Sequence, residues 1–265
     1  MELATSSTSC DFDPAISYAR QTLYRFVALA FLDPRHGSWE TLRSLADDPL
    51  VDDAARLIRQ HPASHAMGLG PGEWPLSALE PDAVFDRLPA TAAELNDRFE
   101  GTFGLLVSSA CPPYETEYVS AKHAFQRAQG LADISGFYRA FGLRPATILK
   151  EREDHIVLML EFMATLIALE RRATEDADPN SQERVSICRD AQKRFLGGHL
   201  AWWAPAFCRL LSKQDPDGFY GAAGVFLAAF LPSERGMLAI PIALKQAAPS
   251  PLERPEECDH CSLAT

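Results

Sequence analysis

The stretch that decides the fold covers residues 151–170 and reads EREDHIVLMLEFMATLIALE. At about 3.6 residues per turn, Asp154, His155 and Glu161 fall within about a quarter of a helix circumference, and apolar side chains fill the opposite arc. The pattern therefore predicts a largely buried helix with one narrow polar seam. An ordinary core helix with a polar start is the alternative interpretation, because an acidic residue near a helix N-terminus interacts favourably with the helix dipole.

The remaining sequence also reads as helices, which are divided by proline and glycine. Asp13 followed by Pro14 is a typical helix start. Thr91 and Glu94 have the spacing of a capping box, and Gly142 is placed to end a helix. No segment shows the strict alternation of a strand, so we expect an all-α fold with a single compact, bundle-like domain of about ten helices. The expected helices cover residues 14–32, 38–46, 49–60, 91–103, a segment that ends near 129, and then 132–141, 151–170, 178–197, 199–212 and 216–231.

The same proline and glycine positions set the expected domain boundaries. Residues 14–245 form the expected helical domain, which follows a flexible N-terminus of residues 1–13. Residues 246–265 are rich in proline and have no helical period, which predicts a flexible tail. Residues 62–81 contain MGLGPGEWPL and are expected to form a long loop, either mobile or acting as a lid.

The composition excludes several classes of protein. The formal net charge is −11, and phosphate backbones are bound by clustered Lys and Arg, so we expect no nucleic-acid partner. No run of about 20 apolar residues is present, so we expect no membrane insertion. The start of the sequence lacks the basic and apolar regions of a signal peptide, and its cysteines are too sparse for a disulfide scaffold. We therefore expect a cytoplasmic protein.

Catalytic and metal-binding motifs are mostly missing. The sequence has no phosphate-binding GxxxxGK[ST] loop and no HExxH motif. Glu151 and His155 lie four residues apart, where a metal could bridge them on a helix, but two ligands hold a metal poorly and a capping or ion-pair role is simpler. Cys258 and Cys261 are weak metal candidates, since a structural zinc site needs four ligands. We expect no cofactor, no metal site and no catalytic residue.

Segments in four parts of the chain, in this order and with these gaps, resemble the TorD/DmsD/NarJ family of molybdoenzyme maturation chaperones. The proline-tyrosine-acidic turn, the step into Gly142, the Asp154-His155 helix and a later His-Trp segment each match the pattern of that family by residue type. Met159 departs from it, because several relatives carry an acidic residue there. The segments are PPYETEY at 112–118, FYRAFGL at 137–143, EDHIVLMLEFM at 153–163 and HLAWWAPAF at 199–207.

The resemblance implies a cytoplasmic, all-helical chaperone and not an enzyme. Its partner would be the apo form of a molybdopterin-containing oxidoreductase, bound through a twin-arginine leader peptide or N-terminus while the cofactor is inserted before export. Either a monomer or a homodimer fits the resemblance, and guanine nucleotide binding and the identity of the client stay open.

Such a leader carries an arginine pair followed by an apolar run. Guanidinium groups favour carboxylates, and the apolar run favours a groove between helices. Trp202 is either such a peptide anchor or an ordinary core aromatic. The expected peptide-binding residues are the acidic Glu115, Glu117, Asp154 and Glu161, together with Tyr114, Tyr118, His155 and Trp202.

Two other functions stay open at this point. The protein could carry a metal or a cluster through Cys258 and Cys261 in its tail. It could also be a helical metal-dependent enzyme that uses Glu151, His155 and distant carboxylates. The enzyme would need stoichiometric metal, and the carrier would lose its function on deletion of residues 257–265, a deletion that the chaperone should tolerate.

Overall fold

The fold is all-helical in the part of the chain that the structure describes. This structure is a computed structural model, and it describes residues 12–104, 110–120, 123–144, 151–243 and 247–248. Within these ranges there are ten α-helices and no strand, and a single antiparallel bridge joins Tyr114 to His155. The expected all-α fold is confirmed. No helix in the same ranges is long and apolar enough to cross a membrane.

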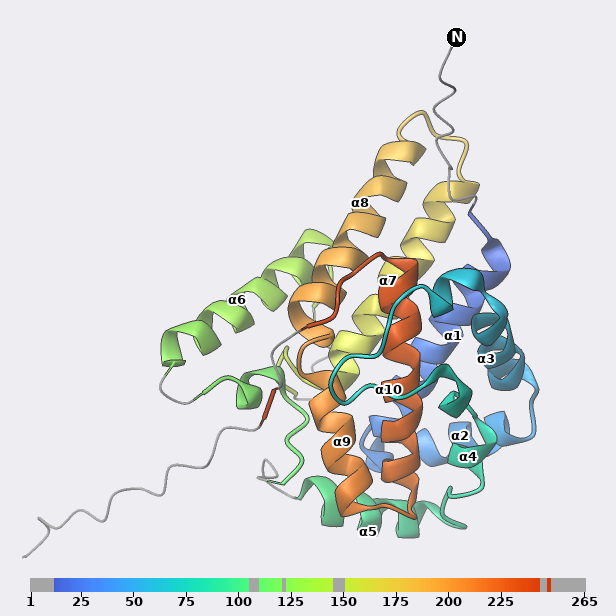
Figure 1. Cartoon of the computed structure of the whole chain (residues 1–265), viewed down its shortest axis with the longest axis vertical. Coiled ribbons are helices and arrows are strands. Elements are labelled where there is room, and N and C mark those ends of the chain that lie inside the picture. The colour runs from blue at the N-terminus through green and yellow to red at the C-terminus, as the bar shows by residue number, and fades with distance from the viewer. Residues whose placement is uncertain (1–11, 105–109, 121–122, 145–150, 244–246, 249–265) are drawn as a thin grey trace, which may run out of the picture.

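The helices are joined by connections of different lengths, some of which contain short helical turns (Figure 1). They are α1 (Pro14–Phe31), α2 (Ser38–Ala46), α3 (Leu50–Gln60), α4 (Asp82–Phe85), α5 (Ala92–Phe103), α6 (Ala124–Ala140), α7 (Ile156–Glu175), α8 (Ser181–Phe195), α9 (Ala204–Gln214) and α10 (Phe219–Met237). The turns are the 3₁₀ segments η1 (Pro34–His36), η2 (Pro62–His65), η3 (Leu76–Ala78) and η4 (Glu115–Tyr118), and the π-helical segment η6 (Leu196–Leu200).

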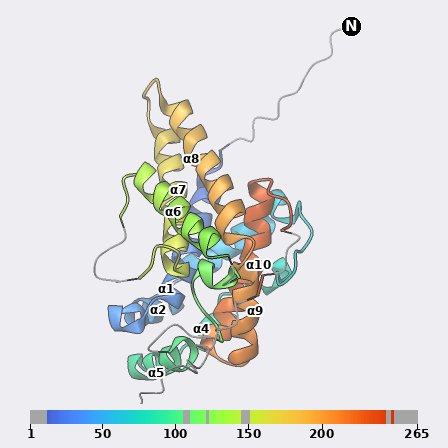
Figure 2. The ribbon, with the colours of Figure 1, turned by 90° about the vertical axis from the view of Figure 1, so that its left-hand side faces the viewer.

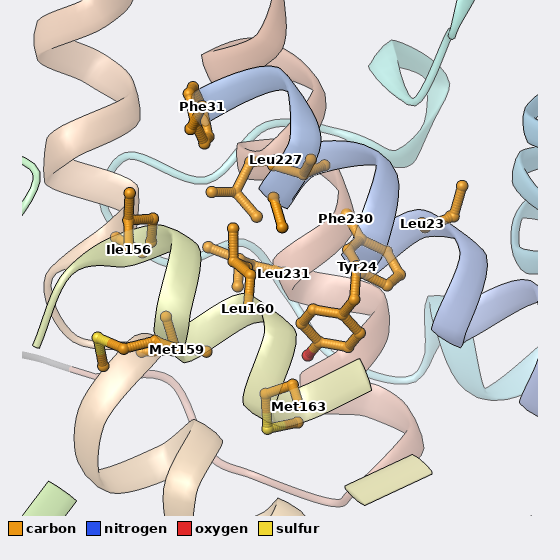
Figure 3. Close-up of a cluster of buried hydrophobic side chains, with 14 of the residues drawn as sticks. Leu23, Tyr24, Phe31, Ile156, Met159, Leu160, Met163, Leu227, Phe230 and Leu231 are labelled. Atoms are coloured by element: carbon orange, nitrogen blue, oxygen red, sulfur yellow. The ribbon is translucent and has the colours of Figure 1, made fainter. Parts of the chain in front are cut away.

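Helix α7 lies in the middle of the bundle, between α1 and α8, and α10 pairs with α9 (Figures 1 and 2). The apolar arc of α7 is fully buried, with Leu160 beside Leu231 of α10 and Met163 near Tyr24 of α1 (Figure 3). Tyr24 of α1 and Phe230 of α10 meet edge to face with ring centroids 5.0 Å apart. Burial of such side chains contributes about 1.5–3 kcal/mol each, so this cluster is the main source of stability.

A buried polar network also joins the helices. Arg20 of α1 donates from Nε and Nη2 to the carboxylate of Glu234 in α10, both at 2.7 Å. Its Nη2 also donates to Gln192 of α8 at 3.0 Å, and Gln192 donates to Glu170 of α7 at 2.6 Å. Because buried polar groups are costly without partners, this network favours one arrangement of the four helices.

The helix ends predicted from the sequence are largely confirmed. Asp13 caps α1 by accepting from the amide of Ala15 at 2.8 Å, and Thr91 caps α5 by accepting from the amide of Glu94 at 3.2 Å. The Glu94 carboxylate reaches back to the amide of Ala90, one residue before the expected partner. Gly142 follows α6 with φ of 70°, the left-handed conformation that glycine adopts most readily.

Several predicted boundaries are wrong. Helix α7 begins at Ile156 and not at residue 151, because the preceding residues bond to the turn at 114–118. The two short helices expected up to residue 141 are a single helix, α6, which begins at Ala124. The glycine pair at 197–198 continues α8 into the π-helical segment η6, and α9 then begins at Ala204.

Residues 62–81 form the expected long connection, which contains only the short turns η2 and η3, and a role as a mobile lid stays a prediction. Glu73 forms an ion pair of 2.6 Å with Arg235 of α10, and their side chains are only 3% and 1% exposed. The amide of Trp74 donates to the carbonyl of Ala228 at 3.0 Å. The segment is therefore fastened along α10. Residues 1–11 and 249–265, which include Cys258 and Cys261, lie outside the described ranges, so the expected flexible ends and the metal-like spacing stay predictions.

Candidate functional site

The turn η4 and the residues that precede α7 hold each other in place. The amide of Glu115 donates to the carbonyl of Asp154 at 3.1 Å, and the amide of Ile156 donates to the carbonyl of Pro113 at 2.9 Å. Tyr118 is buried and donates from its hydroxyl to the carbonyl of Pro112 at 3.1 Å. The proline carbonyls thus serve as acceptors, and two segments far apart in sequence form one polar surface.

Asp154 is fully buried beneath this surface. Its Oδ2 accepts from the amide of Thr116 at 3.0 Å and from the hydroxyl of Thr116 at 2.7 Å. Arg152 donates to both of its oxygens at 3.0 Å. Asp154 was expected inside a helix of residues 151–170, but it precedes α7 and its carboxylate is paired within the chain.

Arg152 covers the buried carboxylate from the solvent side. Its guanidinium carbon lies 4.3 Å from the centroid of the Tyr114 ring. Its Nη1 donates to Glu117 at 3.0 Å and its Nη2 to Thr116 Oγ1 at 2.7 Å. Tyr114 in turn donates its hydroxyl to Glu151 at 2.5 Å. Three predicted site residues, Tyr114, Glu117 and Asp154, therefore contact one arginine that was not predicted, and Glu151 joins them through Tyr114.

His155 is the N-cap of α7 and not a residue of its first turn. Its Nδ1 accepts from the amide of Val157 at 3.3 Å, and its ring packs edge to face against Tyr114 with centroids 5.0 Å apart. Burial lowers its pKa from 6.5 to about 4, although the charges of Glu151 and Asp154 oppose the shift. The ring is therefore neutral near pH 7, as its acceptor role requires.

The expected helical face shared by Glu151 and His155 does not form, since both residues precede α7. In the described ranges, no group of three or more His, Cys, Asp and Glu side chains is placed to hold a metal ion. The geometry around His155 thus gives no support to the metal-dependent enzyme.

A second polar cluster lies on the other side of the same turn. Glu115 is 5% exposed and accepts from Nε1 of Trp202 at 3.1 Å. His199 lies between two carboxylates, with Nδ1 at 3.1 Å from Glu115 and Nε2 at 3.2 Å from Asp133. A pocket of about 630 Å³ opens over these groups and is lined by Gln126 and Gln129 as well. We call this the acidic pocket.

Charges in the acidic pocket are set by burial and by pairing. Desolvation raises the pKa of Glu115, while its hydrogen bonds with His199 and Trp202 oppose the rise. Burial favours neutral His199, but the bonds and charges of Glu115 and Asp133 outweigh it and raise the pKa of His199 above 6.5. The pocket therefore holds two carboxylates and an imidazole that retains its proton more readily than usual, and a cation would complete its charge balance.

Sequence reasoning missed His199 and Asp133 as members of this pocket. His199 and Trp202 lie three residues apart and were each noticed, but only Trp202 was assigned to the site. His199 lies in the π-helical segment η6 and Trp202 in the turn that follows it, and a π-turn leaves no clear signal in a sequence. Asp133 arrives from α6, whose bounds were predicted incorrectly.

Glu161 lies apart from both clusters, in a groove between α1, α2, α3 and α7. The groove has a volume of about 690 Å³ and mostly apolar walls, and Arg25 and Arg171 also line it. The Glu161 carboxylate has no hydrogen bond or ion pair with any described residue, and burial raises its pKa. Leu32 and Val157 line both this groove and a small pocket beside Glu151 and His155, so the two hollows are neighbours. We call the larger hollow the apolar groove.

Comparison with known proteins places the chain in a family. Residues 77–209, which make up half of the chain, match the family described as nitrate reductase delta subunit. The chain belongs to this family. The matched range contains η4, the residues before α7 and the acidic pocket.

Curated relatives of this family member are named as chaperones. The chaperone protein TorD of Aliivibrio salmonicida is 29% identical over 48% of this chain and 56% of its own length. TorD of Vibrio cholerae serotype O1 (strain M66-2) is 30% identical over 48% and 54%. The selenate reductase assembly chaperone protein of Thauera selenatis is 32% identical over 41% and 52%. The chain thus spans about half the length of the curated relatives it matches.

Proposed function

We propose that this protein is a cytoplasmic chaperone that binds the apo form of a molybdopterin-containing oxidoreductase. It holds the leader peptide or N-terminus of that client while the molybdenum cofactor is inserted, and so delays export. It catalyses no reaction of its own. Relatives named TorD and selenate reductase assembly chaperone support this class of function.

One observation carries the proposal: the family match encloses the whole polar site. Residues 77–209 include Glu115, Asp133, Asp154, His199 and Trp202. These residues come from separate elements and meet around one turn. Glu115, Asp133, His199 and Trp202 line a concave acidic surface there, and Asp154 is buried beneath the other side of the turn. Such a surface is suited to holding a basic peptide.

The acidic pocket is the proposed site for an arginine of the leader. Glu115 presents a buried carboxylate, and Asp133 presents a second one that is 62% exposed. A guanidinium group forms paired hydrogen bonds with carboxylates and stacks on aromatic rings, and Trp202 supplies such a ring at the pocket wall. Binding one guanidinium neutralises the excess negative charge that His199 leaves uncompensated.

The apolar groove is the proposed site for the apolar run that follows the arginines. Leu29, Leu45 and Val51 line it, and it neighbours the small pocket beside Glu151 and His155. Helix grooves of this kind bind apolar segments by removing their side chains from water. Glu161 would then pair with a basic side chain of the client.

The test is calorimetric titration with a synthetic peptide that carries an arginine pair followed by an apolar run. We expect binding without any cofactor, weaker binding at higher salt, and weaker binding when lysine replaces both arginines. Glu115→Gln together with Asp133→Asn should weaken binding about tenfold or more, since hydrogen bonds to charged groups contribute about 1.5–3 kcal/mol. Glu183→Gln, on the exposed face of α8, is the matched control and should bind like the wild type. Equal affinity of the double variant and this control would overturn the assignment of the acidic pocket.

A further inference from the structure

We propose that Tyr114, Thr116, Glu117 and Asp154 form a guanidinium-binding cage, and that Arg152 occupies it as an internal competitor for a client arginine. This inference rests on the proposed function and adds a second arginine site to it. The cage matches a guanidinium group and not merely a positive charge.

The guanidinium group of Arg152 makes contacts at all three of its nitrogen atoms and on one face. Nε and Nη2 both contact the Asp154 carboxylate at 3.0 Å, which is a paired arrangement that an ammonium cannot make. Nη1 contacts Glu117 at 3.0 Å, and Nη2 also contacts Thr116 Oγ1 at 2.7 Å. The face of the group lies on the Tyr114 ring. The cage therefore has a directed acceptor and a flat aromatic wall for one guanidinium.

The exposure of Arg152 itself distinguishes it from Arg20 and Arg235, whereas Arg189, which pairs with buried Glu170, is exposed to a similar degree. Arg20 and Arg235 are 8% and 1% exposed, and their carboxylate partners are 0% and 3% exposed. In the cage, Asp154 is likewise 0% exposed, but the Arg152 side chain is 41% exposed. The Asp154 carboxylate is thus part of the buried interior, while the Arg152 guanidinium lies at the surface. Arg152 can therefore move away without a rearrangement of the core.

Removing Arg152 from the cage is unfavourable when nothing replaces it, but replacing Arg152 by a client arginine is not. Without Arg152, the buried Asp154 carboxylate would retain only its two bonds with Thr116 and no opposite charge. A client arginine that takes the same position restores every contact. The free energy of exchange is therefore small, and the internal arginine lowers the apparent affinity for any peptide that must displace it.

The cage and the acidic pocket lie on the two sides of one turn. Within η4, Glu115 points to His199, whereas Thr116 and Glu117 point to Arg152. Two sites on a single short turn provide for two neighbouring arginines. One of these sites is open, and the other is occupied by the chain itself.

The decisive experiment is chemical rescue of Arg152→Gln. Thermal melts should show that methylguanidinium chloride raises the Tm of this variant above the rise it gives to the wild type, and that methylammonium chloride does not. Arg152→Lys, which keeps a cation near Asp154, serves as the second variant and should show the same preference for methylguanidinium. Absence of a selective rise in both variants would overturn the cage.

Competition is measured with the arginine-pair peptide. We expect Arg152→Gln to bind it about two- to fivefold more tightly than the wild type, because a partly exposed ion pair contributes about 0.2–1 kcal/mol. Equal or weaker binding by this variant, with the wild type binding normally, would overturn the competitor role. Rescue by methylguanidinium without peptide binding by any form would instead leave the cage intact and contradict the proposed function.

Discussion

At the residue scale, the ability of each carboxylate in the site to bind a ligand depends on whether it is already paired within the chain. Sequence spacing grouped Asp154, Glu115, Glu117 and Glu161 as equivalent acids, but the structure gives each a different neighbour. Only the partners decide whether a carboxylate can receive a ligand, because a buried and paired acid offers little to a newcomer. Two histidines in the same region have pKa values displaced in opposite directions, which makes their roles separable by pH.

His155 should make the protein sensitive to acid. Its pKa falls from 6.5 to about 4 on folding, so the unfolded state binds the proton more readily and stability declines as the pH drops through this window. The full shift corresponds to about 3 kcal/mol. His155→Asn keeps a good N-cap acceptor and removes the titration. Urea denaturation between pH 7 and 4 should show a smaller loss of the free energy of unfolding for this variant than for the wild type. An identical pH dependence in the two proteins would contradict the lowered pKa of His155.

His199 should have the opposite dependence. Its pKa is raised above 6.5, so the stabilisation it contributes is fully present below 6.5 and is lost as the pH rises through the raised value. Asp133→Asn and Glu115→Gln each remove one charge that holds the proton. Nuclear magnetic resonance titration of the His199 ring should therefore give a lower pKa in either variant than in the wild type. An unchanged pKa in both would mean that the two carboxylates do not set it.

At the element scale, the presence of most helices could be predicted from the sequence, whereas the structure of the segments between them could not. Asp13, Thr91 and Gly142 mark their helix ends by local chemistry, and such signals act over a few residues. The start of α7 was misplaced because residues 151–155 bond to a turn that lies far away in sequence. The acidic pocket could be predicted only in part for the same reason: Glu115 and Trp202 had visible motifs, whereas Asp133 and the η6 turn depend on packing.

Gly72 tests how firmly the segment at 62–81 is fastened. It has φ of 85°, and an added Cβ would lie 2.8 Å from the carbonyl oxygen of Pro205. Gly72→Ala should therefore destabilise the protein by at least about 1–2 kcal/mol, the cost of the left-handed conformation alone. Gly136→Ala is the control, because this glycine lies inside α6 with nothing within 4 Å, and alanine there should stabilise by about 0.5–1 kcal/mol. Similar melting of the Gly72 variant and the wild type would mean that the segment is free to move.

At the scale of the whole molecule, the first and last helices are joined through the core. Helix α1 packs on α7 and α3, α10 packs on α9, and the Arg20–Glu234 pair connects α1 with α10. A rigid core of this kind holds the surface turn η4 against the start of α7, where both proposed arginine sites lie. The binding surface is thus carried by segments that the bundle positions, and its geometry should be insensitive to changes that leave the bundle intact.

The Arg20–Glu234 pair provides the whole-molecule prediction. Glu234→Leu should destabilise the protein by about 3–5 kcal/mol, because it leaves the buried Arg20 guanidinium without its charge partner. The double variant Arg20→Met, Glu234→Leu removes both charges and should recover most of the loss, since apolar groups of similar volume replace a buried pair at little cost. Denaturant unfolding of the two single variants and the double variant forms a complete cycle. If the pair acts only through stability, the double variant should bind the arginine-pair peptide as the wild type does; a loss of binding in a well-folded double variant would show that this pair sets the geometry of the distant surface.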